Sequence, residues 1–330
     1  MKKWSTVLAG IMGVVVIVGM MSSFSLAAPE AYKFEFICHG GEENPAWGLI
    51  YRGMKDAAET VGVSAVMYRP TTEGDLAQQL SNFEAALTKK PDGIITTIPH
   101  PTMFNGVIQK ALDKGIPVIC SNTNGLVGTG SPLEEKISFV GQNLEPAAYI
   151  LAKEASKYFP SPDKARILLS MGGPGLSWAE QRSSGITTFL EENGYTFYER
   201  LDTSMAMDVA ESRITAYLKA HPETNVIFSV GGMDIAAAAA VARKLGYKPG
   251  QITIAGFDIL PETLIEIKKG YIQLLIDQQL YLQGYIPVIQ LFLIKKYGFS
   301  GWDVDTGQAF VDASNVDEII AYSKIRAIGG

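Results

Sequence analysis

Short runs of apolar and β-branched residues alternate with helix-forming stretches along the chain from residue 34 onward. This alternation is typical of a parallel sheet that is covered by helices on both faces. The runs form two series of five, which predicts an α/β fold with two similar, doubly wound lobes. The predicted strands are 34–38, 64–68, 93–97, 117–121 and 137–140, followed by 166–171, 195–199, 226–230, 252–256 and 272–276.

Capping residues mark the ends of the helices between these strands. A helix over 46–61 stops before Gly62, and Asp75 is a good N-cap for a helix that reaches Lys89. A long helix is expected over 280–296, after the last strand of the second series. No long proline- or serine-rich linker separates the two series, so short crossings are expected to join the lobes.

The first 28 residues have the layout of a cleavable export signal. Lys2 and Lys3 precede an uncharged apolar run from 7 to 21, and small residues follow it up to Ala27. The run of about 15 residues is shorter than the roughly 20 that a membrane span needs. We expect cleavage after Ala27, with Ala28 as the second choice, and a periplasmic mature protein. The alternative is an uncleaved anchor helix.

The charge of the mature chain limits its partners. The formal charge is −6, or −8 once Lys2 and Lys3 are removed with the signal. An acidic exported chain without a basic cluster argues against nucleic acid and anionic membranes as partners. Neutral solutes and proteins are the partners that we expect.

The two cysteines, Cys38 and Cys120, fall near the ends of the first and fourth predicted strands. In a sheet of order 2-1-3-4-5 one strand separates them, so they are about 9 to 10 Å apart, beyond the roughly 7 Å that a disulfide spans. We therefore expect two buried thiols. Among the two cysteines and the three histidines, only the adjacent Cys38 and His39 show ligand spacing, so no metal site is predicted.

Polar and aromatic residues follow the strands of the first series, where ligands bind in doubly wound sheets. Asn44 is placed to cap the helix after the first strand, and Trp47 lies on its first turn. An indole face beside an amide suits a sugar or polyol, although an N-cap and a half-buried aromatic explain the same pattern. Asn122 and Asn124 follow the fourth strand, where turn chemistry alone also explains them.

The second series has a similar set of residues at its strand ends. A glycine cluster at 172–175 precedes a helix, but its spacing is not that of a dinucleotide fingerprint. Asp258 lies just beyond a strand, where a helix cap or turn is the alternative role. The polar residues 277–279 close the last strand, which favours a ligand or hinge role.

The sequence has few signs of an enzyme. No nucleophile elbow, zinc-protease pair or phosphate-binding loop occurs, and no cofactor is predicted. Glu180 and Asp258 are the carboxylates available for an acid/base pair, but a binding site uses the same groups to accept hydroxyl protons. A binding protein is therefore the stronger interpretation.

Four motifs, at 44–47, 114–119, 255–258 and 276–279, give the chain a family resemblance. It resembles the exported solute-binding proteins of sugar ABC importers, of the ribose and galactose type related to lactose-repressor cores, over about 31–320. The resemblance implies the type I periplasmic binding protein fold, with a three-strand hinge between the lobes. It also implies a monomer that captures a sugar or polyol and delivers it to a membrane permease, with a chemoreceptor as a further candidate partner.

The resemblance implies sugar contacts at Asn44, Trp47, Arg182, Asp258 and Gln278. An arginine fork and a carboxylate together suit vicinal hydroxyls. The full set of candidate ligand-binding residues is Asn44, Trp47, Asn122, Asn124, Trp178, Glu180, Arg182, Asp234, Asp258 and Gln278.

Two departures from the family pattern leave the ligand open. Asn122-Thr123 stands where many relatives carry Asp-Arg, and Gly231 stands where others carry Asn, so that Asp234 is the candidate to supply the missing contact. These changes put ribose and galactose in doubt. Polyols, inositols, deoxy sugars and an autoinducer-2-like signal stay open.

The resemblance implies a hinged clamp with crossings near 140, 277 and 305. The first lobe would combine 29–140 with 278–304, and the second 141–277 with 305–330. Closure around the solute is the signal that a permease can recognise. The competing functions are a receptor-type binding protein that hands a signal to a membrane sensor, a periplasmic sugar-processing enzyme, and a repressor, which the export signal argues against.

Overall fold

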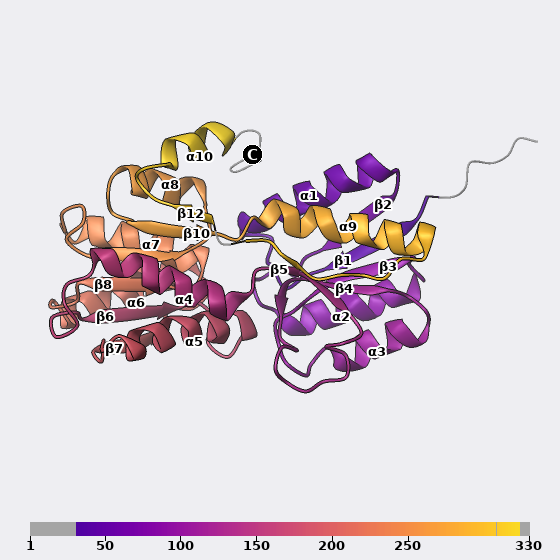
Figure 1. Ribbon diagram of the computed structural model, residues 1–330, viewed down its shortest axis with the longest axis horizontal. Helices are drawn as coiled ribbons and strands as arrows, with labels where there is room; N and C mark the ends of the chain where they lie inside the picture. The colour runs from indigo at the N-terminus through magenta and orange to yellow at the C-terminus, as the bar shows by residue number, and fades with distance from the viewer. Residues whose placement is uncertain (1–30, 308, 324–330) are drawn as a thin grey trace, which may run out of the picture. The chain divides into compact units, whose positions relative to one another are not determined.

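The computed structural model describes residues 31–307 and 309–323, and the predicted export signal lies outside them. These residues form two six-stranded sheets, each covered by helices (Figure 1). We call each sheet with its helices a lobe. Among the described residues, none of the helices combines the length and apolar character needed to cross a bilayer.

The first lobe contains a fully parallel sheet of order β11-β5-β4-β3-β1-β2. Helices α1 and α9 pack against each other beside it. The strands are β1 (Lys33–Ile37), β2 (Ser64–Tyr68), β3 (Gly93–Ile98), β4 (Val118–Asn124), β5 (Ser138–Gly141) and β11 (Val304–Asp305). The helices are α1 (Ala46–Val61), α2 (Leu76–Thr88), α3 (Asn105–Asp113) and α9 (Leu280–Tyr297).

The second lobe repeats this order as β12-β10-β9-β8-β6-β7, with β12 antiparallel to β10. Helix α4 packs on α5, and α6 packs on α7. The strands are β6 (Ile167–Met171), β7 (Tyr198–Asp202), β8 (Val226–Ser229), β9 (Thr253–Phe257), β10 (Leu274–Asp277) and β12 (Ala309–Val311). The helices are α4 (Leu144–Ala155), followed by a 3₁₀ turn (Ser156–Tyr158), α5 (Ser177–Glu192), α6 (Met207–Ala220), α7 (Gly232–Lys244), α8 (Pro261–Lys268) and α10 (Val316–Ser323).

The predicted fold class is confirmed, and the 2-1-3-4-5 strand order expected for the first sheet is found in both sheets. The prediction of a strand over 195–199 is wrong in its bounds, because the strand at this place, β7, begins three residues later and covers Tyr198–Asp202. Tyr195 instead closes α5: its amide donates to the carbonyl of Leu190, and its buried ring packs edge-on against Phe159, with the ring centroids 5.6 Å apart. The prediction of ten strands missed β11 and β12, which are only two and three residues long.

A helix cap, a close contact between two helices and two buried thiols show how single residues fit the fold. Asp75 caps α2 as predicted, since its carboxylate accepts from the amide of Gln78 at 2.9 Å. Gly284 lets α9 approach α1 closely, because a Cβ at this position would lie 1.9 Å from the carbonyl oxygen of Ile50. Cys38 and Cys120 are buried, free thiols, as the strand order predicts. Burial raises the pKa of Cys38 to about 12.

Candidate ligand-binding site

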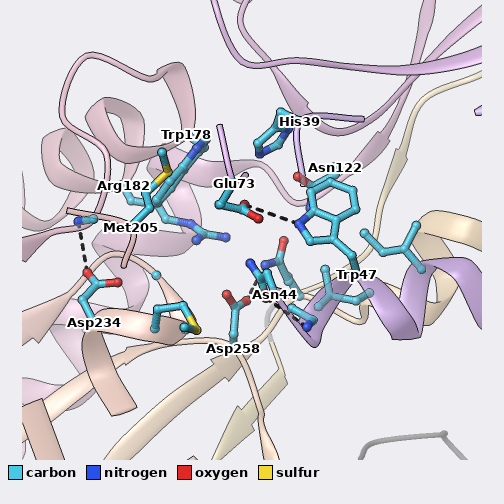
Figure 2. A pocket seen from close by; sticks show the side chains of 18 of the residues that line it. His39, Asn44, Trp47, Glu73, Asn122, Trp178, Arg182, Met205, Asp234 and Asp258 are labelled. Atoms are coloured by element: carbon cyan, nitrogen blue, oxygen red, sulfur yellow. Dashed lines mark hydrogen bonds between the residues drawn. The ribbon is translucent and has the colours of Figure 1, made fainter. Parts of the chain in front are cut away.

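A pocket lies at the carboxyl ends of strands from both sheets (Figure 2). It encloses about 680 Å³ of empty space, part of which is open solvent. Residues from loops, helix starts and strand ends of both lobes line it: His39, Asn44, Ala46, Trp47, Ile50, Glu73, Asn122, Leu144, Gly172, Trp178, Arg182, Met205, Gly231, Gly232, Met233, Asp234, Asp258, Gln278 and Leu280.

Eight of the ten predicted site residues line this pocket, and two do not. The eight are Asn44, Trp47, Asn122, Trp178, Arg182, Asp234, Asp258 and Gln278. Asn124 is used in a turn, where its side-chain oxygen accepts from the amide of Leu126. Glu180 pairs with Arg200 at 2.5 Å and accepts from the amide of Gly175, so it supports the glycine-rich loop from the outside.

Trp47 is fixed in the first lobe by contacts on three sides. Its indole packs on the backbone of Gly40, where a Cβ would lie 1.9 Å from the ring, and its edge meets the ring of His39 with the centroids 5.0 Å apart. Its indole N–H donates to Glu73 at 3.4 Å. Asn44 supports the start of α1, since its side-chain oxygen accepts from the amide of Ala46, although the formal N-cap is Pro45. A rigid aromatic platform results.

Arg182 lines the pocket as a cation from the second lobe, and it is only 4% exposed. It donates to the carbonyl oxygen of Val230 at 2.7 Å, and its guanidinium lies 3.9 Å from the centroid of the Phe257 ring. Burial lowers its pKa, while the neighbouring charges of Asp258 and Asp234 oppose this effect. The residue remains a guanidinium at neutral pH, because an arginine pKa starts near 12.5 or above.

Asp234 occupies the space that a larger residue at position 231 would fill. A Cβ on Gly231 would lie 2.9 Å from a carboxylate oxygen of Asp234, whose other oxygen accepts from the amide of Gly172. Burial raises the pKa of Asp234 to about 7, and the charge of Asp258 adds to this effect. The pair Gly231 and Asp234 therefore places a carboxyl at a position where the sequence resemblance led us to expect an amide.

Glu73 is a pocket residue that sequence reasoning missed. Figure 2 shows its carboxyl directed toward the space between Trp47 and Arg182. It accepts from the amide of Gly41 at 2.6 Å as well as from the indole of Trp47. Burial raises its pKa to about 7. The loop that carries Glu73 has no motif, and its neighbour Asp75 gave only a helix-cap signal. His39, which the sequence analysis considered only as a metal ligand, also lines the pocket, as do Met205 and Met233, and none of the three was predicted to do so.

His39 contributes a neutral ring to the pocket wall. Burial lowers its pKa to about 3, and its side chain contacts the hydroxyl of Thr97 at 2.9 Å. Among residues 31–307 and 309–323, no group of three or more histidine, cysteine or acidic side chains is arranged to hold a metal ion.

Two buried nitrogens in the pocket wall have no hydrogen-bond partner within the described part of the chain. They are the indole nitrogen of Trp178 and Nε of Arg182. The acceptors that face the pocket are more numerous, since Glu73, Asp234 and Asp258 all carry carboxyl oxygens. The wall is thus rich in acceptors, with a few strong donors in the second lobe.

The two lobes contact each other around the rim of the pocket. The amide of Ser177 donates to the carbonyl of Pro99 at 2.9 Å, and Gln181 donates to the carbonyl of Asn124 at 3.4 Å. On another part of the rim, Met205 lies against Gly74, where a Cβ would approach its methyl carbon to 2.3 Å. The described conformation is therefore a closed one.

Comparisons with known proteins show which proteins the chain is similar to in sequence and fold. The chain is 27% identical over 305 residues to the xylose/arabinose-binding protein XylF of Sulfolobus acidocaldarius, covering 89% of this chain and 74% of that protein. A periplasmic sugar-binding protein of an ABC sugar transporter from Legionella pneumophila superposes with a TM-score of 0.76 at 31% identity, covering 84% of this chain and 100% of that one.

A further solved structure, a XylFII–LytSN complex, matches with a TM-score of 0.77 at 26% identity over 87% of this chain and 99% of that one. A family model described as the periplasmic binding protein domain matches residues 34–296. This match covers most of the chain and all the predicted and observed pocket residues. The chain belongs to the periplasmic binding protein family.

Proposed function

We propose that the protein captures a neutral sugar or polyol between its two lobes and delivers it to an ABC importer. The observation that carries the proposal is the composition of the pocket wall. Trp47 and Trp178 come from different lobes, and Arg182 lies beside carboxyl groups at the ends of the second sheet. Aromatic faces pack on the C–H groups of a sugar ring, while the polar groups bind its hydroxyls.

Charge favours a neutral ligand over an acidic one. Three carboxyl groups and one guanidinium line the pocket, so an anionic ligand would meet more negative than positive charge. A hydroxyl can donate to a carboxylate and accept from a guanidinium or an indole N–H. The many acceptors therefore fit a ligand with several hydroxyl groups, and pentoses come first because of the relative that is named for xylose and arabinose.

Delivery requires that the two lobes open and close. We propose that 29–140 with 278–304 moves as one lobe and 141–277 with 305–330 as the other, about crossings near 140, 277 and 305. Ligand contacts from both lobes favour the closed state over the open one. A permease that binds both lobes in their closed arrangement then selects the loaded protein.

The predicted export signal fits this role, since delivery to an importer takes place outside the membrane. We propose that the chain is exported and cleaved after Ala27, which gives a periplasmic protein that acts as a monomer. The receptor-type function is the second candidate, and the likeness to the XylFII–LytSN complex supports it. In that case the closed form would dock on a sensor protein.

A thermal-shift screen tests the proposal. The mature protein is heated with D-xylose, L-arabinose, hexoses, polyols and inositols, and product formation is measured in the same samples. A ligand at 100 times its Kd stabilises the folded state by about 2.7 kcal/mol, so a specific sugar gives a clear rise in Tm. No rise with any of these compounds would contradict the proposal, and conversion of a sugar would favour an enzyme.

A further inference from the structure

A buried glutamine, Gln283, connects the pocket to two of the segments that cross between the lobes. It lies on the first turn of α9 and is fully buried. Its side-chain amide contacts Asn122 at the end of β4, Gln278 after β10 and Thr306 after β11. Its backbone carbonyl accepts from the hydroxyl of Ser121 at 2.7 Å, which ties the start of α9 to β4. Gln283 itself does not line the pocket, whereas Asn122 and Gln278 do.

The orientation of the Gln283 amide follows from an acceptor-only neighbour. The backbone oxygen of Gln278 cannot donate, and it lies 3.0 Å from Nε2 of Gln283. The same nitrogen donates to the hydroxyl of Thr306 at 3.0 Å, and that hydroxyl in turn donates to the carbonyl of Gln278 at 2.7 Å. The nitrogen of Gln283 therefore faces the crossings, and its oxygen Oε1 faces Asn122.

This orientation determines which end of the Asn122 amide faces a ligand. Oε1 of Gln283 can only accept, so the group 2.8 Å away must be the nitrogen Nδ2 of Asn122. The oxygen Oδ1 of Asn122 is then the end left for the pocket. The backbone of Asn122 is left-handed, with φ of 67°, a conformation that asparagine adopts more readily than most residues.

We propose that Gln283 is a positioning residue that makes Asn122 a hydroxyl acceptor for the ligand. The inference rests on the function proposed above. The same side chain holds the backbone of Gln278, whose side-chain amide donates to Asp258. Gln283 thereby links an acceptor in the first lobe to one in the second. A methionine in its place has the right size but leaves the Asn122 amide free to rotate and to present its donor end.

Gln290 provides a matched control on the same helix. It is also fully buried in α9, and its amide bonds to the carbonyl of Trp302 at 2.9 Å and to the hydroxyl of Ser138 at 3.3 Å. None of these three residues lines the pocket. Methionine at 283 or at 290 leaves buried polar groups unpaired, so both variants should be less stable than the wild type. Only the change at 283 should alter ligand binding.

The binding test is a double-mutant cycle with D-xylose and L-arabinose as probes. For the sugar that the wild type binds more tightly, Gln283→Met and Asn122→Ala should each raise Kd about tenfold, and the double variant should be within about twofold of either single one. Gln290→Met should stay within about twofold of the wild type. A wild-type Kd in Gln283→Met, or fully additive effects, would overturn the inference.

A measurement without ligand separates this inference from the proposed function. In the wild type and in Gln290→Met, NMR should show the side-chain NH₂ of Asn122 as a hydrogen-bonded, slowly exchanging pair, and Gln283→Met should lose this protection. The same protected pair in Gln283→Met would overturn the inference whether or not a sugar binds. A protected pair in a wild type that binds no sugar would reject the proposed function alone.

Discussion

Glu73 is the residue whose replacement should change stability and binding in opposite directions. Burial raises its pKa from 4.5 to about 7, while in the unfolded chain the carboxyl has its ordinary value. Between these two pH values the folded protein binds the proton more tightly than the unfolded chain. Glu73 therefore makes folding less favourable as the pH rises from about 4.5 to about 7, and the full cost is present above that range.

The size of this effect follows from the shift in pKa. Each unit is about 1.4 kcal/mol, so the shift from 4.5 to about 7 costs up to about 3 kcal/mol at pH 8. Glutamine carries no charge, but its NH₂ cannot accept from Gly41 or Trp47 as a carboxyl oxygen does. Relative to pH 4.5, Glu73→Gln should gain about 2 to 3 kcal/mol over the wild type at pH 8, which corresponds to about 5 °C in Tm. At pH 4.5 this gain should be absent, because the wild-type carboxyl is then protonated in the folded state.

Binding should respond in the opposite sense if Glu73 accepts a hydroxyl of the ligand. A carboxylate accepts with both oxygens and more strongly than an amide does, so Glu73→Gln should weaken sugar binding about tenfold at pH 8. The assay pairs thermal unfolding and calorimetric titration at pH 5, 6, 7 and 8. Glu43, which accepts from the backbone amide of Glu73 outside the pocket lining, is the control, and Glu43→Gln should leave affinity unchanged. A Tm gain that is equal at pH 5 and pH 8 would refute the reasoning.

Three further predictions concern the pocket and the start of the mature chain. Trp47→Ala and Arg182→Ala should each weaken binding by about 2 kcal/mol or more in calorimetry, because the two side chains line the pocket from opposite lobes and are proposed to contact the ligand there, whereas Glu180→Ala should bind as the wild type does. Asp258→Asn should raise Kd about tenfold for the best sugar and less for the analogue that lacks the contacted hydroxyl, and equal titration curves for both proteins would make Asp258 a structural residue. N-terminal sequencing of the secreted protein should begin near Ala28, and recovery of Met1 would disprove cleavage.

The parts of the fold that the sequence predicted well are those with a strong local signal. Helix α1 ends before Gly62, and Asp75 caps α2, because glycine and aspartate have well-defined conformational roles at helix ends. Strand β7 was misplaced because the aromatic and β-branched residues at 195–197 satisfy a strand pattern, while Tyr195 is used to pack the end of α5. Tertiary packing decided the boundary there.

The candidate site was predictable where a residue lies in a motif just after a strand or on the helix that follows it, and harder to predict in a loop without a motif. Asp258 and Gln278 follow β9 and β10, and both line the pocket. Glu180 has the right place in the sequence, but its side chain points to Arg200 on a neighbouring strand. Glu73 lies in the loop three residues before α2 begins at Leu76. Only the contacts that it makes with Gly41 and Trp47 in the folded protein place it in the pocket.

Calorimetric titration of the mature protein with D-xylose, L-arabinose and the best compound of the thermal-shift screen tests the central claim most directly. The account predicts saturable binding of one neutral sugar or polyol per chain, weakened about 30-fold or more in Arg182→Ala. It would be contradicted if no neutral sugar or polyol bound, or if the bound sugar had the same Kd in the wild type, in Trp47→Ala and in Arg182→Ala.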